Sequence, residues 1–296
     1  MVTLLGLLFT FLWSTSAIAI KFGLASTTPL FLAAVRVVLA GALLFVYMYM
    51  IRKKSPWPKG KEWRSLLILG FLNTTIYLGS IFWALNDVSA GLFNLFVTVN
   101  PFLVAALSFV FLNRKVSRKE WAGMIVAAIG LAIAAGPELV QAEAEISGII
   151  VIGIGMASMA IGSIYFKKTD IRLPSSVINT WQLCIGGTLL MPFAFGLERE
   201  QFFLTTDAHF FGALSWLVFV TSIGTMVLWF YLLKKDAVRA NNWLFLTPVF
   251  GYSLAALLLN ETVSIYDMMA TIFVVSGLLL SGNIPMPRKK TRRMNS

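Results

Sequence analysis

The residue best suited to bind a solute in this sequence is an arginine that lies within an apolar segment. Arg36 stands about seven residues after the start of the segment 29–51, which is roughly 10 Å along a helix. We expect no acidic residue at a similar depth in any apolar segment. A buried guanidinium without a counter-ion could bind an anionic group of a solute, such as a carboxylate. It could equally bond to helix carbonyls or extend its charged end toward the membrane surface. The sequence leaves both interpretations open.

Other polar side chains fall at helical spacing within apolar segments, where an unpaired polar group costs free energy. Asn179 and Gln182 are three residues apart and share one helix face, and Asn94 and Thr98 form a similar stripe. Hydrogen bonds between helices explain the first pair equally well. The predicted substrate-binding residues, which include aromatic and hydroxyl groups at similar depth, are Trp13, Ser16, Arg36, Asn73, Tyr77, Asn94, Thr98, Asn179, Gln182 and Asn241.

Two prolines interrupt the apolar segments that carry Asn94 and Asn241. Pro101 and Pro248 each lie seven residues after the corresponding asparagine. A proline inside a helix lacks a backbone N–H and leaves a carbonyl unpaired, so it bends the helix. We therefore predict a kink at each proline, which could line a cavity or act as a hinge.

The composition requires that membrane-spanning helices hold these residues. Hydrophobic residues make up 58% of the 296 positions and charged residues only 12%, about half of the roughly 25% usual in soluble domains. A spanning helix needs about 20 mostly apolar residues. Ten segments meet this requirement: 3–22, 29–51, 64–84, 90–112, 119–136, 147–166, 174–194, 211–233, 240–260 and 265–284. The expected fold is an all-α integral membrane protein with ten transmembrane helices. The first segment has no basic residues before it, so we interpret it as a retained helix and not as a signal peptide.

Lysine and arginine are concentrated on one side of these ten segments. If the N-terminus is cytoplasmic, all but three of the 24 basic residues fall in or next to cytoplasmic loops, the exceptions being Lys21, Arg36 and Arg199. This is the positive-inside pattern. It predicts a multi-pass protein of the bacterial inner (plasma) membrane with cytoplasmic N- and C-termini. Because the basic residues lie in loops between spans, nucleic acid is not an expected partner.

The second half of the sequence repeats a motif of the first half at an offset of 147 residues. The aligned pairs are Pro101 with Pro248, Asn113 with Asn260, Ser117 with Ser264, and Gly130 with Gly277. The loop after the first motif is basic and the loop after the second is acidic, so the same turn is expected on opposite sides of the membrane. An odd number of helices per repeat produces this inversion. We therefore predict a first five-helix repeat at 1–137, an inverted second repeat at 147–284 and a basic cytoplasmic tail at 285–296, with a central cavity between the repeats.

The chain resembles the EamA-like group of the drug/metabolite transporter superfamily over essentially its whole length. The resemblance is carried by Leu12-Trp13-Ser14, Lys21-Phe22-Gly23, Arg36, Asn100-Pro101-Phe102, Leu112-Asn113, Thr247-Pro248-Val249 and Leu259-Asn260-Glu261. The family pattern usually has an acid after the small residue that ends helices 4 and 9. Glu261 matches this acid, and Arg114 replaces it in the first half. The resemblance implies ten helices in two inverted repeats around a central cavity, and many such proteins export amino acids or other metabolites.

We predict a secondary transporter or exporter of small metabolites, amino acids or related carboxylates, that works by alternating access between the two repeats. Two alternatives stay open: an integral-membrane enzyme acting on lipid-linked substrates, and a non-catalytic membrane scaffold. The sequence has no HExxH motif, no P-loop and a single cysteine, Cys184, while its one histidine, His209, lies at the edge of a segment. We therefore expect no enzyme activity, no cofactor and no metal. The expected partners are a small-molecule solute and the lipid bilayer, and no oligomeric state is predicted.

Overall fold

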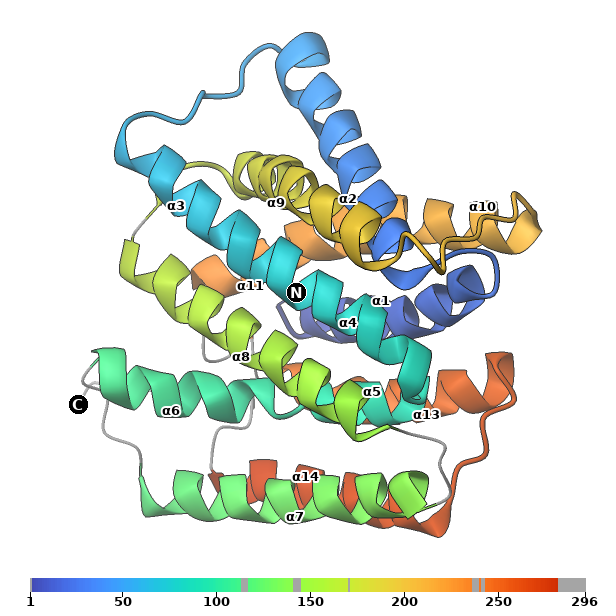
Figure 1. The fold of residues 1–296 in the computed structure, drawn as a ribbon. Coiled ribbons are helices and arrows are strands. Elements are labelled where there is room, and N and C mark those ends of the chain that lie inside the picture. Colours follow the sequence, from blue (N-terminus) through green and yellow to red (C-terminus); the bar gives the residue numbers. More distant parts are fainter. Residues whose placement is uncertain are drawn as a thin grey trace, which may run out of the picture.

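The computed structural model describes residues 2–112, 117–140, 145–169, 171–235, 240 and 243–281, and the statements below concern these residues. Among them the chain is helical, with one isolated β-bridge between Thr27 and Leu204. Figure 1 shows the helices arranged in one bundle. The prediction of an all-α membrane fold is confirmed.

The helices follow one another with short connections. The first half contains α1 (Val2–Leu24), α2 (Pro29–Phe45), η1 (Val46–Ile51), α3 (Lys61–Gly70), η2 (Phe71–Ile76), α4 (Tyr77–Asp87), α5 (Ala90–Val97), α6 (Asn100–Leu112) and α7 (Arg118–Val140). The second half contains α8 (Ile146–Thr169), α9 (Ser175–Leu197), α10 (Ala208–Ser215), η3 (Trp216–Thr225), α11 (Met226–Lys235), η4 (Trp243–Leu246), α13 (Thr247–Leu258) and α14 (Ile265–Ser281). The elements η1, η2 and η3 are π-helical and continue the α-helices beside them, whereas η4 is a 3-10 turn.

Eight helical segments in the described part of the chain are long and apolar enough to cross a membrane. They match the first eight predicted segments, with ends that differ by a few residues; the predicted segment 64–84, for example, is the helix Lys61–Asp87. Two shorter apolar helices, Thr247–Leu258 and Ile265–Gly277, fall within the ninth and tenth predicted segments. This set is consistent with a ten-helix membrane protein. The predicted basic tail, 285–296, lies outside the described residues.

The fourth predicted segment is not one continuous helix. α5 and α6 are separated by a turn at Thr98 and Val99. Pro101 stands in the first turn of α6, where its missing N–H removes no helical hydrogen bond. Pro248 likewise stands in the first turn of α13, directly after η4. The prolines therefore begin helices, whereas the sequence predicted kinks within continuous ones.

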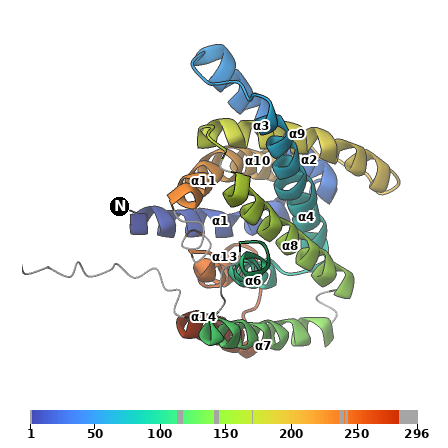
Figure 2. The same cartoon turned by 90° about the vertical axis from the view of Figure 1, so that its left-hand side faces the viewer.

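α1 lies inside the bundle and contacts helices from both halves of the chain, among them α4, α5, α10 and α13. α2 packs against α9, and α4 packs against α8. The buried apolar side chains form a large core cluster that includes Phe9, Phe82 and Phe230. α7 and α14 pack closely against each other and form a separate layer at one side of the bundle (Figures 1 and 2).

The connections gather at two opposite ends of the bundle, and their charges differ. We name the end at the right of Figure 1 the acidic end. Its loops and helix termini carry Asp87, Glu145, Glu198, Glu200, Asp207 and Glu261. We name the opposite end the basic end, and it carries Arg52, Lys53, Lys54, Lys59, Lys61, Lys167, Lys168, Arg172, Lys234 and Lys235. These ends correspond to the sides that the sequence predicts as external and cytoplasmic.

Candidate functional site

A small cavity, named the central cavity below, lies among α1, α2, α4 and η3 near the middle of their lengths. Its wall includes five of the ten predicted substrate-binding residues: Trp13, Ser16, Arg36, Asn73 and Tyr77. The cavity measures ≈ 40 Å³ in this conformation. That space holds a few water molecules, since each needs about 10–15 Å³. The conformation is therefore closed, and a solute would bind only after the helices move apart.

Arg36 projects from α2 into the central cavity and is 4% exposed. Its Nε–H donates to the hydroxyl of Ser222 at 2.8 Å, and its Nη2 donates to the hydroxyl of Thr221 at 2.8 Å. Both partners lie on η3, so the guanidinium joins the two halves of the chain. Its carbon Cζ lies 5.4 Å from the centre of the Phe82 ring, which gives a cation–π contact. Nη1 is buried and has no hydrogen-bond partner among the described residues.

The partners of Arg36 are all uncharged, which is unusual for a buried cation. Among the described residues, none that lines the central cavity is acidic. Glu198 and Asp207, two acids of the second half, stand at helix ends and bind backbone or hydroxyl groups there. Arginine keeps its proton in proteins, so the cavity carries one uncompensated positive charge. One donor, Nη1, is available for an anionic group.

Two amide side chains meet beside the cavity and connect helices of opposite halves. The Nδ2 group of Asn73 on η2 donates to Oε1 of Gln182 on α9 at 2.9 Å. Asn179, one turn earlier on α9, donates to the backbone carbonyl of Ser222 at 2.9 Å. Asn73 Oδ1, Gln182 Nε2 and Asn179 Oδ1 are buried without partners among the described residues. The helix face that Asn179 and Gln182 share thus points toward the site, although neither residue is part of the cavity wall.

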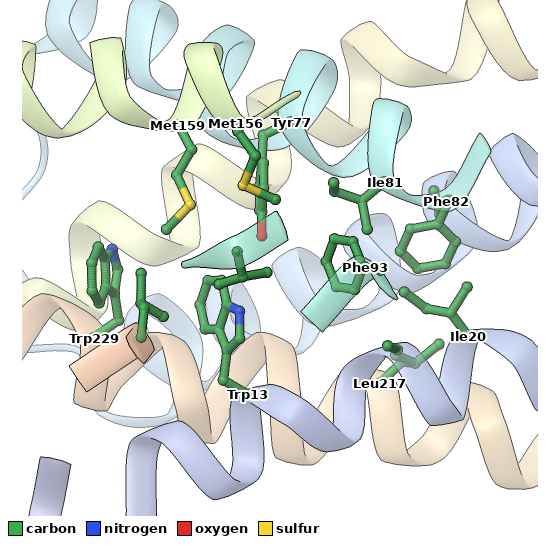
Figure 3. Packing of buried hydrophobic residues seen from close by; sticks show 14 of the residues in the cluster. Trp13, Ile20, Tyr77, Ile81, Phe82, Phe93, Met156, Met159, Leu217 and Trp229 are labelled. Atoms are coloured by element: carbon green, nitrogen blue, oxygen red, sulfur yellow. The ribbon is translucent and has the colours of Figure 1, made fainter. Parts of the chain in front are cut away.

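Aromatic rings form another side of the site. The ring centroid of Trp13 lies 6.4 Å from that of Tyr77 and 6.0 Å from that of Trp229. Phe9 packs on Trp13 from the neighbouring turn of α1, with centroids 5.2 Å apart. Figure 3 shows Trp13 and Trp229 beside each other, with Tyr77 and Met156 opposite them. The site therefore combines a cationic group with an apolar wall.

Some predicted residues lie elsewhere. Asn94 and Thr98 are fully buried, but neither is part of the cavity wall. Asn94 Nδ2 donates to the carbonyl of Ala90, and the backbone carbonyl of Asn94 accepts from the hydroxyl of Thr247. The hydroxyl of Thr98, in the turn after α5, donates to the carbonyl of Leu95. The stripe therefore packs α5 against α13. Asn241 lies outside the described residues.

The sequence interpretation missed the hydroxyl groups of η3. Thr221, Ser222 and Thr225 all line the central cavity. η3 is a π-helical stretch, in which the hydroxyl of Thr225 donates to the carbonyl five residues earlier, that of Val220. Such stretches are rare and are frequent at functional sites. Three hydroxyl residues within five positions of an apolar segment are a signal that could have identified this face.

Two glutamates at the acidic end bind helix N-termini of the other half. The carboxylate of Glu198 accepts from the N–H groups of Leu30 and Phe31 at 2.6 and 2.9 Å, at the start of α2. The carboxylate of Glu261 accepts from the N–H groups of Ala90 and Gly91 at 2.9 and 3.1 Å, at the start of α5. The first turn of a helix has unpaired N–H groups and a partial positive charge, so a carboxylate is a favourable partner.

Asp207 adds a further contact between the halves at the acidic end. Its carboxylate accepts from the backbone N–H of Phe210 at 2.8 Å and from the hydroxyl of Ser26 at 2.7 Å. These two hydrogen bonds, together with the nearby His209, hold the pKa of Asp207 below its ordinary value. The hydroxyl of Thr27 also donates to the carbonyl of Phe203. The acidic end is therefore closed by polar groups.

At the basic end, the two halves meet through a partly exposed aromatic cluster that consists of Tyr49, Trp57, Trp63 and Trp181. Trp181 comes from the second half, and its centroid lies 4.6 Å from Trp63 and 5.7 Å from Trp57. The indole N–H of Trp181 donates to the hydroxyl of Tyr49 at 2.8 Å. Most of the contact area in this cluster is apolar, so its energy depends little on a single hydrogen bond.

A larger space of ≈ 440 Å³ lies on the outer surface between α1, α10 and α13. Its wall includes Phe11, Ile18, Phe22, Trp216 and Leu258. Because this wall is almost wholly apolar and opens sideways, acyl chains of the surrounding bilayer would cover it. It does not offer the polar partners that a small charged metabolite needs.

The fold and the central cavity define a class of protein. Helices of both halves surround a buried polar site near the middle of the spans, which is the arrangement of secondary carriers. The model of the EamA-like transporter family matches residues 1–136 and 146–283, and the chain belongs to this family. It is thus a multi-span membrane protein of a transporter family, as the resemblance predicted.

Known relatives agree with this assignment. An uncharacterised transporter of Synechocystis sp. is 26% identical over 287 residues, covering 91% of this chain and 86% of the relative. Protein PecM of Dickeya dadantii is 26% identical, covering 95% and 92%. A Salmonella typhimurium protein named "Probable amino-acid metabolite efflux pump" is 28% identical, covering 94% and 93%. One solved structure has the same fold, with a TM-score of 0.69, 17% identity and coverage of 95% of this chain and 96% of that one.

Proposed function

We propose that this protein is a secondary transporter that exports small metabolites bearing a carboxylate, such as amino acids or related carboxylates, and that Arg36 binds the carboxylate. The observation that carries the proposal is the guanidinium of Arg36, which is buried in the central cavity with Nη1 unpartnered among the described residues. Thr221 and Ser222 accept hydrogen bonds from Nη2 and Nε, so they fix the orientation of the guanidinium and of its third nitrogen, Nη1. The name of the Salmonella relative supports export as the direction.

Alternating access requires two halves that exchange conformations, and the proposed halves are the repeats 1–137 and 147–284. The family model matches once in each. α7 and α14 begin with the same cap at an offset of 147. Ser117 and Glu120 bind each other's backbone N–H groups, and Ser264 and Asp267 do the same. Equivalent helices thus begin in equivalent ways.

Close helix contacts repeat with the halves exchanged, which also supports inverted repeats. In the α7–α14 pair, a Cβ at Gly130 would lie 2.9 Å from the carbonyl oxygen of Ala270, and one at Gly277 would lie 2.5 Å from that of Gly123. An offset of 147 carries Gly130 to Gly277 and Gly123 to Ala270. This exchange of the two contacts supports a pseudo-two-fold axis between the proposed repeats.

The same relation holds between α2 and α9. A Cβ at Gly41 would lie 3.0 Å from the backbone nitrogen of Cys184, and one at Gly187 would lie 3.3 Å from that of Val38. An offset of 146 carries Gly41 to Gly187 and Val38 to Cys184. Glycine at both crossings lets these helices approach closely, as in other membrane proteins.

The cycle we propose opens one end of the bundle at a time. In the present conformation Glu198 and Glu261 tie the acidic end together across the halves, and the central cavity is too small for a solute. Opening toward the acidic end breaks these contacts, and closing restores them. The turn before Pro101 and the 3-10 turn before Pro248 are the proposed hinges, because they lack continuous helical hydrogen bonds.

We further propose that the basic end faces the cytoplasm of a bacterium, which places the protein in the inner (plasma) membrane. Apart from Arg199, the described basic residues in loops lie at that end. Excess lysine and arginine in short loops marks the cytoplasmic side. Two alternative functions are an enzyme that acts on lipid-linked substrates and a scaffold. Among the described residues, neither is supported by a site as well defined as the central cavity.

The test is flux of labelled carboxylate metabolites from liposomes that contain the purified protein. Arg36→Ala should lower the flux at least tenfold, because losing a hydrogen bond to a charged group costs about 1.5–3 kcal/mol. Arg36→Lys should retain part of it, since the charge stays and the forked geometry is lost. Arg199→Ala, which removes an exposed arginine from a loop of the acidic end, is the matched control.

If a folded Arg36→Ala protein shows full flux, Arg36 does not bind the solute. If the protein with the natural sequence moves no solute, the proposed transporter function is wrong. A thermal unfolding curve for each variant separates loss of binding from loss of fold.

A further inference from the structure

The charge of the central cavity restricts the charge of its solute. Arg36 is the one charged side chain on the described cavity wall. The groups that face it from η3 are the hydroxyls of Thr221 and Ser222, and those from α4 are the rings of Tyr77 and Phe82. α1 contributes Trp13 and Ser16, η2 contributes Asn73, and α5 and α9 contribute apolar side chains. The empty cavity therefore carries a charge of about +1 at any pH at which proteins fold.

The unpartnered groups beside the cavity are suited to an anion with uncharged polar groups. Arg36 Nη1 is a donor on the cavity wall, and behind the wall Gln182 Nε2 is a donor and Asn179 Oδ1 is a neutral acceptor. Asn73 Oδ1 packs against Gly162 of α8 and does not face the cavity. A carboxylate on Arg36 neutralises the cavity, and an amide N–H or a hydroxyl of the solute can bind the Asn179 acceptor once the helices move apart. An ammonium group would need an acid or several acceptors at membrane depth. Without them, a zwitterion would leave both its own cation and Arg36 partly uncompensated.

We propose that the central cavity accepts its solute as a net monoanion, in the manner of an N-acylated amino acid or a hydroxy or oxo acid, and that the membrane potential drives its export. This inference rests on the transporter function proposed above. A solute that crosses with its charge uncompensated moves one negative charge per cycle. Because the cytoplasm is negative, the field pushes anions outward.

The expected effect of the potential is large. One elementary charge that crosses about 100 mV corresponds to a concentration ratio of about fiftyfold. No acidic residue that the structure describes lies on the cavity wall to carry a proton with the solute. Glu198, Asp207 and Glu261 are at the acidic end and are engaged with backbone or hydroxyl groups. A proton gradient at constant potential should therefore leave the flux unchanged.

The experiment uses the full chain in liposomes loaded with matched probes that differ only in charge. For each of four side chains (alanine, leucine, methionine and phenylalanine), the probes are the free amino acid, its N-acetyl derivative and its amide. A potassium gradient with valinomycin sets the potential. We expect the N-acetyl anions to leave fastest, with a rate that rises severalfold when the interior is made negative. The free amino acids should leave more slowly, and the cationic amides should not leave.

Arg36→Gln makes the cavity neutral and should lower the ratio of N-acetyl to free amino-acid flux at least tenfold. Arg199→Gln should leave that ratio unchanged. The flux ratios of the natural sequence test the inference even if Arg36→Gln does not fold. Faster flux of the free amino acids, or N-acetyl flux that ignores the potential, overturns the inference and leaves the transporter function standing. If none of the twelve probes moves, both fail.

Discussion

Different kinds of contact join the two halves of the chain at the two ends of this bundle. At the acidic end, the carboxylates of Glu198 and Glu261 bind backbone N–H groups of the opposite half over distances of 2.6 to 3.1 Å. At the basic end, Trp181 packs into a cluster of aromatic rings. Hydrogen bonds to a charged group weaken steeply with distance and angle, whereas apolar contacts tolerate sliding. Under the proposed cycle, we therefore expect the contacts of the acidic end to break within a short movement and those of the basic end to weaken over a longer one.

The largest effect should follow from removing both carboxylates. Glu198→Ala with Glu261→Ala leaves four N–H groups at the starts of α2 and α5 without their partners. Each charged contact contributes about 1.5–3 kcal/mol, so the open population should rise at least tenfold. A cysteine at position 16, in a chain whose Cys184 is replaced by alanine, reports this opening. Its labelling by a membrane-impermeant thiol reagent from the acidic side should accelerate at least tenfold.

Glu200→Ala is the control for this measurement, since Glu200 is exposed on the same loop as Glu198. It should leave the labelling rate unchanged. Equal labelling rates in the double variant and the control would mean that the glutamates do not hold the acidic end closed.

A smaller effect is expected at the basic end. Trp181→Phe removes the indole N–H that donates to Tyr49 but keeps an aromatic ring in the cluster. One neutral hydrogen bond contributes about 0.5–1.5 kcal/mol, so the thermal midpoint should fall by only a few degrees. Labelling at position 16 from the acidic side should not change. A large increase there would show that the two ends are not closed independently.

The smallest effect concerns Asp207 and appears only in acid. Hydrogen bonds from Phe210 and Ser26 lower its pKa in the folded protein. A lowered pKa stabilises the fold above the ordinary value of about 3.9, and this contribution is lost as the pH falls through the folded value. At neutral pH the carboxylate stays charged, so closure of the acidic end should not vary. In Asp207→Asn, the thermal midpoint should therefore change less with pH across the acidic range than it does in the natural sequence.

Glu200→Gln serves as the reference for the pH series because it changes an exposed acid at the same end. If Asp207→Asn and Glu200→Gln alter the pH dependence equally, the contact between Asp207 and Ser26 contributes nothing specific to closure.

Prediction from sequence worked best where a property depends on neighbouring residues alone. The apolar segments are the helices of the bundle, because the cost of exposing polar groups to lipid depends on local composition and length. Arg36 was predicted as a binding residue because a charged side chain within such a segment is rare. Five of the ten predicted residues line the central cavity. These are the residues nearest the middle of α1, α2 and the η2–α4 helix.

Sequence patterns did not show those features that depend on how one helix is rotated against another. Asn94 and Thr98 do share a stripe on their segment, but that stripe packs on α13 through Thr247. Periodicity shows which residues share a face and does not show which neighbour the face meets. For the same reason, the hydroxyls of Thr221 and Ser222 were not connected with Arg36.

The sequence by itself determined the all-helical membrane fold, the family, and the presence of a cation at membrane depth. Only the tertiary structure decided what surrounds that cation. Its partners on η3 lie 185 and 186 residues away, and the glutamates that close the acidic end lie 167 to 171 residues from the N–H groups they bind. Local composition sets where a helix lies relative to the bilayer, whereas contacts at such separations depend on how all the helices pack together.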